Sequence, residues 1–238
     1  MTDVTFHGGV NDIGGNQFLV KDKDTKVFMD FGMSFSKENK FFSQFLNARG
    51  SNSLNDMFEL GILPKIKGLY RRDYARHMDF GGDEETEIDA VLLTHAHVDH
   101  CAYIPYLRED IPIYCSEESK LIMQNFDDTG HDQYLTLKEK FQIYENKKGE
   151  ISRATGDKVA IPRRIEVFES GKEFSIDSIK VQPLPVDHSI AGVHAFVLHT
   201  SEGTIGNTAD LRFHGRRSKD TEKFVERCGE SDIDLLLC

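Results

Sequence analysis

The segment Thr94-His95-Ala96-His97-Val98-Asp99-His100 directly follows an apolar run at residues 90–93. Such a run is typical of a buried strand, and residues two apart on an extended chain point the same way. His95 and His97 can therefore reach one metal ion together, and the aspartate and last histidine emerge beside them if the chain turns into a helix. Imidazole and carboxylate groups together suit zinc, with manganese or iron as alternatives. The motif predicts a metal site at a strand end.

Two later segments place further polar side chains after predicted strands. Val186-Asp187-His188-Ser189 follows a strand pair at 173–182, and Thr208-Ala209-Asp210 ends a strand at 203–207. We expect His188 to be the third ligand of the first metal, with Asp187 orienting a ligand ring or the loop. Asp210 is well placed to bridge two metals, although the cap of a following helix is the alternative reading of this aspartate.

The order of the remaining patterns predicts two sheets flanked by helices. Short apolar runs separated by glycine-rich turns predict an opening β-meander at 4–6, 17–20 and 27–29. A partly helical insertion follows at about 34–88, long enough to be a functional loop or lid. Further helices are expected at 99–109, 116–126, 134–144 and 217–228. Further strands are expected at 111–115, 164–169, 173–176, 178–182, 194–200, 203–207 and 233–237.

Composition limits the class of protein. The 238 residues, 39% hydrophobic and 29% charged, are an ordinary globular mixture for one large domain or two small ones. No apolar run approaches the roughly 20 residues of a membrane span, which argues against an integral membrane protein. The start of the chain lacks the pattern of a signal peptide, and the four cysteines form no CxxC pair, so we expect a cytoplasmic protein with reduced thiols. The net charge of −11 argues against a non-specific nucleic-acid coat but leaves a local basic groove open.

The HxHxDH motif, the later Asp-His-Ser segment and the strand-end aspartate, in this order, resemble the metallo-β-lactamase superfamily. The resemblance spans essentially the whole chain, and Met29-Asp30-Phe31-Gly32 resembles the early strand-end aspartate that supports the family's site. It implies an α/β fold, an αββα sandwich with the site at one edge. It further implies the two metal positions, in which the first ion is held by His95, His97 and His188, the second by Asp99 and His100, and both by Asp210.

A narrower resemblance concerns residues 10–16, Val-Asn-Asp-Ile-Gly-Gly-Asn, and residues 210–215, Asp-Leu-Arg-Phe-His-Gly. Both are similar to the ribonuclease J and cleavage-factor branch, whose members carry a β-CASP domain and act on RNA. That family places one more histidine on the second metal beyond Asp210, where this sequence ends at Cys238; His214 is a possible substitute. We therefore expect one metallo-β-lactamase-like domain over 1–238 with an incomplete second half, from a truncated chain, a fragment or a split gene.

Three functions follow as hypotheses. The leading one is a hydrolase that cleaves RNA phosphodiester bonds with a hydroxide held between two metal ions, zinc or manganese, with Asp99, Asp210 and His188 as its central residues. The alternatives are a hydrolase of a small thioester or ester, and an inactive fragment or metal-binding scaffold. Homo-oligomerisation stays open as well.

Substrate contacts are expected from basic residues, which suit an anionic substrate. Arg212, His214 and Arg216 are the candidates, and they lie in a cluster that continues with Arg217 and Lys219. A second cluster lies in the insertion, where a solvated charged surface is an equal alternative, and it comprises Lys65, Lys67, Arg71, Arg72 and Arg76. The general acid is left open among His199, His214 and Asp187.

Overall fold

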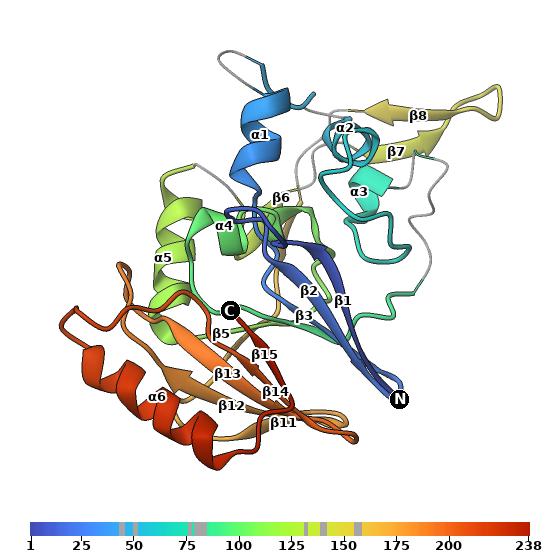
Figure 1. Ribbon diagram of the computed structural model, residues 1–238. Coiled ribbons are helices and arrows are strands. Elements are labelled where there is room, and N and C mark those ends of the chain that lie inside the picture. The colour runs from blue at the N-terminus through green and yellow to red at the C-terminus, as the bar shows by residue number, and fades with distance from the viewer. Residues whose placement is uncertain are drawn as a thin grey trace.

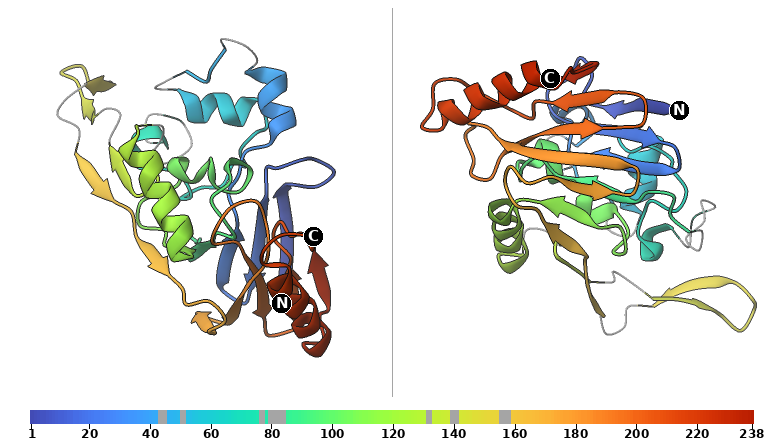
Figure 2. Two further views of the ribbon diagram at one scale, coloured as in Figure 1. Left: turned by 90° about the vertical axis from the view of Figure 1, so that its left-hand side faces the viewer. Right: turned by 90° about the horizontal axis from the view of Figure 1, so that it is seen from below.

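The computed structural model describes residues 1–42, 46–49, 52–75, 78, 85–130, 133–138, 142–154 and 159–238. In this part of the chain two main β-sheets pack face to face, and helices lie on their outer faces (Figure 1). Figure 2 shows these layers from two further directions, with α6 (Ser218–Glu230) outside the second sheet and α5 (Glu117–Asp128) beside the first. The predicted αββα sandwich is confirmed.

The first sheet joins an antiparallel meander to parallel strands in the order β1-β2-β3-β4-β5-β10. The first three strands pair antiparallel, as expected for the opening meander, and β3, β4, β5 and β10 pair parallel. Its strands are β1 (Thr2–Gly8), β2 (Gln17–Asp22), β3 (Thr25–Met29), β4 (Ala90–Leu92), β5 (Ile113–Cys115) and β10 (Ile165–Val167). Because β3 and β4 are parallel neighbours, the residues that follow them meet at one edge of the sheet.

The second sheet has the order β11-β12-β13-β14-β15, antiparallel except for the parallel pair β14 and β15. Its strands are β11 (Phe174–Ile176), β12 (Ile179–Pro185), β13 (His194–His199), β14 (Thr204–Asn207) and β15 (Leu235–Leu237). Two small antiparallel pairs lie outside the sandwich and consist of β6 (Thr136–Lys138) with β9 (Ala160–Pro162) and β7 (Gln142–Glu145) with β8 (Ile151–Ala154).

The alternation of side chains along the strands explains the layers. On β3, Val27 and Met29 belong to the core between the two sheets, whereas Phe28 belongs to the core beneath the helices. On β4, Leu92 belongs to the core between the sheets and Val91 to the core beneath the helices. Successive side chains of a strand point to opposite faces, so a fully apolar run must be covered on both sides. A third, smaller core around Phe224 holds α6 on the second sheet.

The insertion at 34–88 is partly helical, as expected, within its described residues. It contains α1 (Phe35–Phe41), α2 (Ser53–Glu59) and α3 (Arg72–Ala75). Leu54, Met57 and Phe58 of α2 are buried against the first sheet's outer core. Further along the chain, Ser116 caps α5 as predicted, because its side chain accepts a hydrogen bond from the Ser119 amide. None of the helices in the described ranges is long and apolar enough to span a membrane.

The helix predicted over 134–144 is wrong. Its described residues instead contribute β6 and β7, and Leu137 pairs with Ile161 across the β6–β9 ladder. The Asp127 carboxylate accepts hydrogen bonds from the backbone amides of residues 134, 135 and 136 and fixes the entry into β6. A heptad-like spacing of apolar residues over so short a range does not distinguish a helix from irregular strands. Phe141, part of that pattern, lies outside the described residues.

The helix predicted over 99–109 is two short pieces, α4 (Val98–Cys101) and the 3₁₀ turn η1 (Ile104–Tyr106). The Tyr103 amide donates to the Phe31 carbonyl at 3.0 Å and not to its own helix. Pro105 then lies in η1 and has no amide hydrogen to continue an α-helix. The contact with the segment after β3 therefore ends α4 after one turn.

Candidate metal centre

Asp30 and Thr94 begin the site at the ends of β3 and β4. Asp30 has φ of +57°, an uncommon backbone conformation outside glycine, and its amide donates to the Leu92 carbonyl at 2.9 Å. The Thr94 amide and hydroxyl both donate to the Asp30 carboxylate, at 2.8 and 2.9 Å. Asp30 also lies 2.7 Å from Nδ1 of His100. This carboxylate thereby fixes the His100 ring so that Nε2 faces the centre, as the resemblance implied.

The segment after Asp30 positions α4. The amides of Phe31 and Met33 donate to the carbonyls of His100 and Val98 at 2.8 and 3.1 Å. A Cβ at Gly32 would lie 1.7 Å from the carbonyl oxygen of Asp99, so only glycine fits this approach. The two chain segments are therefore in direct backbone contact, which fixes the start of α4.

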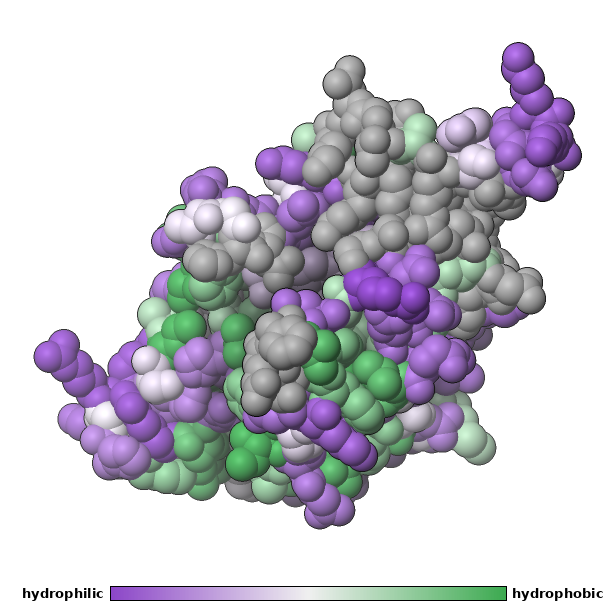
Figure 3. Space-filling model, turned by 90° about the horizontal axis from the view of Figure 1, so that it is seen from above, coloured by the Kyte–Doolittle hydropathy of each residue, from purple (hydrophilic) through white to green (hydrophobic). Residues whose placement is uncertain are grey.

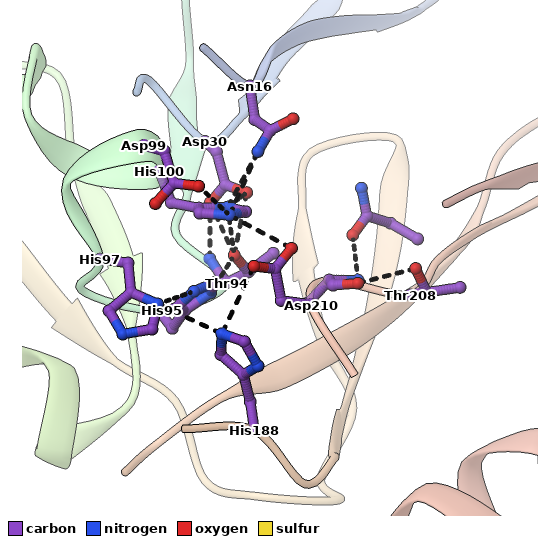
Figure 4. Close-up of polar contacts among 12 residues, drawn as sticks. Asn16, Asp30, Thr94, His95, His97, Asp99, His100, His188, Thr208 and Asp210 are labelled. Atoms are coloured by element: carbon purple, nitrogen blue, oxygen red, sulfur yellow. Dashed lines mark hydrogen bonds and ion pairs between the residues drawn. The ribbon is translucent and has the colours of Figure 1, made fainter. Parts of the chain in front are cut away.

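The loop between β1 and β2 closes the site from a third side. A Cβ at Gly14, where φ is +77°, would lie 2.6 Å from Cβ of Asp99. The Asn16 amide donates to the Asp99 carbonyl at 3.3 Å, and the side-chain Nδ2 of Asn16 lies 3.1 Å from Nε2 of His100 (Figure 4). Sequence reasoning missed Asn16 as a neighbour of the centre, although the resemblance of residues 10–16 to ribonuclease J pointed to this loop.

The first group of convergent side chains contains three histidines. Nδ1 of His97 lies 3.0 Å from Nε2 of His95 and 3.2 Å from Nε2 of His188. Asp210 completes the group, with Oδ2 3.4 Å from Nε2 of His188. One ligand atom of each of these four residues lies within 4.8 Å of all the others. Figure 4 shows their side chains directed toward one another from three separate segments of the chain.

A second group shares Asp210 with the first. Nε2 of His100 lies 3.4 Å from Oδ1 of Asp210 and 3.7 Å from Oδ2 of Asp99. These three residues also offer ligand atoms within 4.8 Å of one another. The structure therefore brings together all six residues named as metal ligands, in two groups joined by one aspartate.

The donor set suits divalent cations. Nδ1 of His97 carries either one proton or one lone pair, so it cannot form good hydrogen bonds with both Nε2 of His95 at 3.0 Å and Nε2 of His188 at 3.2 Å. A cation between them would be bound by three imidazoles and a carboxylate, a combination that zinc accepts readily. His95, with no exposed surface, has few other ways to satisfy Nε2.

The charges of the two groups differ. Burial lowers the pKa of His100, but the carboxylates of Asp30 and Asp210 outweigh it and raise the pKa to about 10. Burial and the positive charge of His100 lower the pKa of His95 to about 2. The hydrogen bond from His100 lowers the pKa of Asp210 to about 2 against the effect of burial. Without a metal ion, the imidazole of His100 is therefore charged between carboxylates, and the imidazole of His95 beside it is neutral.

Asp187 acts on a loop rather than on a ligand ring. Its carboxylate pairs with Nε of Arg212 at 3.1 Å, and its carbonyl accepts from the Arg212 amide at 2.9 Å. A Cβ at Gly215 would lie 1.9 Å from Oδ2 of Asp187, so the loop after Asp210 wraps closely around this carboxylate. The hydrogen bond from Arg212 lowers the pKa of Asp187, which argues against Asp187 as a general acid.

Other predicted residues lie elsewhere. The His194 amide, at the start of β13, donates to the Thr94 carbonyl at 3.1 Å, whereas His199 is at the opposite end of that strand, ~17 Å away at the usual rise. This distance removes His199 as a general acid. His214 and Arg216 are exposed, and neither belongs to the two metal-capable groups among the described residues.

Within the basic cluster of the insertion, Arg71 does not belong to an exposed cationic surface. Arg71 is only 3% exposed; it pairs with Asp73 at 2.8 Å and donates to the Lys138 carbonyl. Lys65 pairs with Glu59. Arg76 lies outside the described residues. Arg71 therefore supports the insertion rather than a substrate.

The geometry of the site agrees with a comparison of the sequence with known families. The family model of the β-lactamase superfamily domain matches residues 71–220. The chain belongs to this superfamily. The match includes the 94–100 motif, His188 and Asp210.

Several longer proteins are similar to the chain. Ribonuclease J of Mycolicibacterium smegmatis is 26% identical over 243 residues, which cover 99% of this chain and 33% of that protein. Ribonuclease J of Helicobacter pylori is 24% identical over 212 residues, 88% of this chain and 23% of that protein. Transcription termination factor FttA of Methanocaldococcus jannaschii is 25% identical over 220 residues, 90% and 28% respectively. The chain thus spans about a quarter to a third of the length of these relatives.

A solved structure supports the arrangement of the fold. A protein of unknown function from Enterococcus faecalis superposes with a TM-score of 0.74 at 26% identity, covering 100% of this chain and 49% of that chain. The whole described sandwich, including the insertion, therefore has a counterpart in a crystal structure.

Proposed function

We propose that this chain is the metal-binding domain of a hydrolase that cleaves RNA phosphodiester bonds with two divalent ions. The observation that carries this proposal is the pair of metal-capable groups that share Asp210. The similarity to ribonuclease J supports RNA as the substrate. The domain comprises residues 1–238, with the insertion at 34–88.

In this proposal His95, His97 and His188 would hold one ion, Asp99 and His100 would hold the other, and Asp210, which belongs to both groups, would contribute to each. Bound there, a pair of zinc or manganese ions would lower the pKa of water and neutralise charge on the scissile phosphate. Asp30 orients His100 through Nδ1. The ion pair of Asp187 with Arg212 keeps the loop that carries Asp210 in place.

The proposed contacts to the substrate come from a few side chains near the metal centre in sequence. Figure 3 shows hydrophobic and hydrophilic side chains intermingled on the upper face of the molecule, so this face is not uniformly basic. Exposed apolar side chains close to the motifs in sequence include Ile13 and Val98. Arg216 and His214, both exposed after Asp210, are the proposed contacts to the RNA backbone.

The first experiment measures metal content per chain by elemental analysis after loading with zinc or manganese. Two equivalents are expected in the unmodified protein and fewer in the Asp210→Asn variant, because Asp210 belongs to both groups. His199→Ala, at the far end of β13, is the matched histidine control and should keep both ions. One equivalent or none in the unmodified protein would favour the scaffold or fragment alternative.

The second experiment incubates the loaded protein with end-labelled single-stranded RNA and with a small thioester. Cleavage of RNA that weakens steeply as salt rises is expected, because contacts to phosphates release counterions. Thioester turnover that RNA does not inhibit would contradict the RNA assignment and favour the alternative hydrolase.

A further inference from the structure

The side-chain amide of Asn16 lies over the face of the His100 ring. Its Nδ2 is 3.1 Å from Nε2 and 3.4 Å from Nδ1 of this imidazole. An atom in the ring plane at these two distances would overlap Cε1, so Nδ2 stands above the ring. The in-plane directions of the ring are used by other groups, because Nδ1 contacts Asp30 and Nε2 is directed toward Asp210. The amide therefore lies beside the ligand nitrogen without occupying its bonding direction.

The two N–H donors of this amide have no strong acceptor within the described chain. The oxygen of Asn16 lies on the side of Gly9, where a Cβ would be 2.6 Å from Oδ1. Figure 4 shows this oxygen pointing away from His100 and the nitrogen pointing toward it. The ring face is the one contact of Nδ2 among the described residues, and a ring face is only a weak acceptor. The donors are therefore available to a ligand.

The backbone of Asn16 is fixed on both sides by segments of the metal centre. Its amide donates to the Asp99 carbonyl at 3.3 Å, and its carbonyl accepts from the Gly32 amide at 3.1 Å. The preceding Gly15 has φ of +72°, and its amide donates to the Met33 carbonyl at 2.7 Å. A donor on such a framework keeps its place before a ligand arrives, which is the property that makes a fixed dipole useful in catalysis.

The surroundings of Asn16 are open to a ligand of the second metal-capable group. Asn16 is half-buried, and the side chain of Asp210, which belongs to that group, is 41% exposed. Zinc binds imidazole nitrogen at about 2.0–2.1 Å, so an oxygen on an ion at Nε2 of His100 comes within hydrogen-bonding reach of a donor beside that nitrogen. Hydrogen bonds to ionised acceptors are the strong ones, so an uncommitted amide donor here suits an anionic oxygen.

We propose that Asn16 is a catalytic residue whose side-chain amide donates a hydrogen bond to a non-bridging oxygen of the scissile phosphate. Asparagine is among the side chains that contact phosphate oxygens of nucleic acids. A donor held in place in this way stabilises negative charge on that oxygen in the transition state. The inference rests on the proposed function, because the phosphate has to reach the second metal-capable group. The competing role is that Asn16 only orients the His100 ring, and the experiment separates the two.

The first measurement titrates the zinc-loaded protein with inorganic phosphate and follows the side-chain amide of Asn16 by NMR. We expect this signal to shift, and we expect phosphate to bind about tenfold more weakly to Asn16→Leu, because leucine packs on the ring without offering a donor. Elemental analysis of the same samples should give two ions per chain in both proteins. Asn125→Leu, at an exposed asparagine of α5, is the matched control and should bind phosphate normally.

The second measurement is the cleavage of end-labelled single-stranded RNA. Asn16→Leu should lower kcat ~10²-fold, which is the loss expected for one donor to a developing negative charge. KM should change little, because the other phosphates of a long RNA contribute most of the binding. Asn125→Leu should cleave at the normal rate.

The outcomes separate this inference from the proposed function. Loss of an ion from Asn16→Leu would mean that Asn16 only orients His100 and would overturn the contact with phosphate. Phosphate affinity or kcat equal to that of the unmodified protein would also overturn the contact, while the RNA assignment stands. Phosphate binding that depends on Asn16, without any cleavage of RNA, would keep the contact and refute the proposed reaction. An unmodified protein that takes up no ion would refute the proposed function and the contact together.

Discussion

Two of the buried polar clusters in the described part of the chain, around Arg163 and at the metal centre, are organised in opposite ways. Arg163 is 5% exposed and donates to the carbonyls of Tyr134, Arg108, Ile104 and Leu107, at 2.9, 2.7, 3.1 and 3.1 Å. Backbone carbonyls accept from four of the five N–H groups of this guanidinium. At the metal centre, by contrast, the nitrogens of His95, His97 and His188 face one another at 3.0 and 3.2 Å. The first cluster holds chain segments together, whereas the second brings together side chains that could hold a metal ion.

The two clusters should respond differently to mutation, because the hydrogen-bond partners of a buried polar group determine what its loss affects. Burial lowers the pKa of Arg163 to about 10, so the guanidinium stays charged near neutral pH and is balanced by carbonyl dipoles. Its loss should therefore damage the fold. The histidines compete with one another when no ion is present, so the loss of one should damage binding and leave the fold intact.

The largest effect is expected from His97→Ala. Its nitrogen faces both other histidines, so its removal should abolish binding of the first ion and reduce RNA cleavage ~10³-fold or more. The free energy of unfolding, measured with urea in the presence of a chelator, should change by less than about 1 kcal/mol. A variant that keeps normal turnover would refute the ligand assignment.

Arg163→Met tests the opposite cluster. Removal of the guanidinium takes one donor from each of four carbonyls, of which that of Ile104 keeps the Leu107 amide, and the expected loss is about 3–5 kcal/mol in the free energy of unfolding. Urea denaturation of the metal-free protein measures it. Arg164→Met, at the neighbouring exposed arginine, is the matched control and should change stability by less than about 0.5 kcal/mol. If Arg163→Met were as stable as the control, the comparison between the clusters would fail.

Addition of metal should stabilise variants of the two clusters to different extents. Zinc at a hundred times its dissociation constant should stabilise the unmodified protein by about 2.7 kcal/mol, because the ion binds the folded state. Arg163→Met should gain a similar increment from its lower starting point, whereas His97→Ala should gain far less. The stability gained on adding zinc is measured by thermal unfolding of each protein with and without the ion. Equal gains in all three proteins would locate the stabilising ion outside the histidine group.

Much of the centre could be predicted because its parts are local in sequence. Within a few residues, the 94–100 motif follows the end of β4, places two histidines two residues apart on an extended segment, and enters α4. The roles of Asn16 and Arg163 could not be predicted, because each depends on chain segments that meet only after folding. His199 was a reasonable candidate by residue type, but strand pairing places it at the wrong end of the sheet.

Asp22 is an intermediate case at the opposite edge of the sandwich, and it sharpens the comparison at low pH. Its Oδ1 accepts from the hydroxyls of Thr2 and Ser201 at 2.8 and 2.5 Å, whereas its buried Oδ2 has no partner among the described residues. Burial raises its pKa, but hydrogen bonds, led by the one from Ser201, outweigh it and lower the pKa from 3.8 to about 2.

A carboxylate with a depressed pKa in the folded state stabilises the protein above its unfolded pKa, and this contribution disappears as the pH falls through the folded value. In the metal-free protein, Asp22 should therefore contribute about 1–2 kcal/mol above pH 4 that is lost between pH 4 and 2. Asp22→Asn should be less stable at pH 6 and should show a flatter decline in that interval. Identical pH profiles, measured by urea denaturation, would mean that the unpaired Oδ2 cancels the benefit of the hydroxyl contacts. Asp22 would then be a buried carboxylate that contributes neither to stability nor to the metal-capable groups.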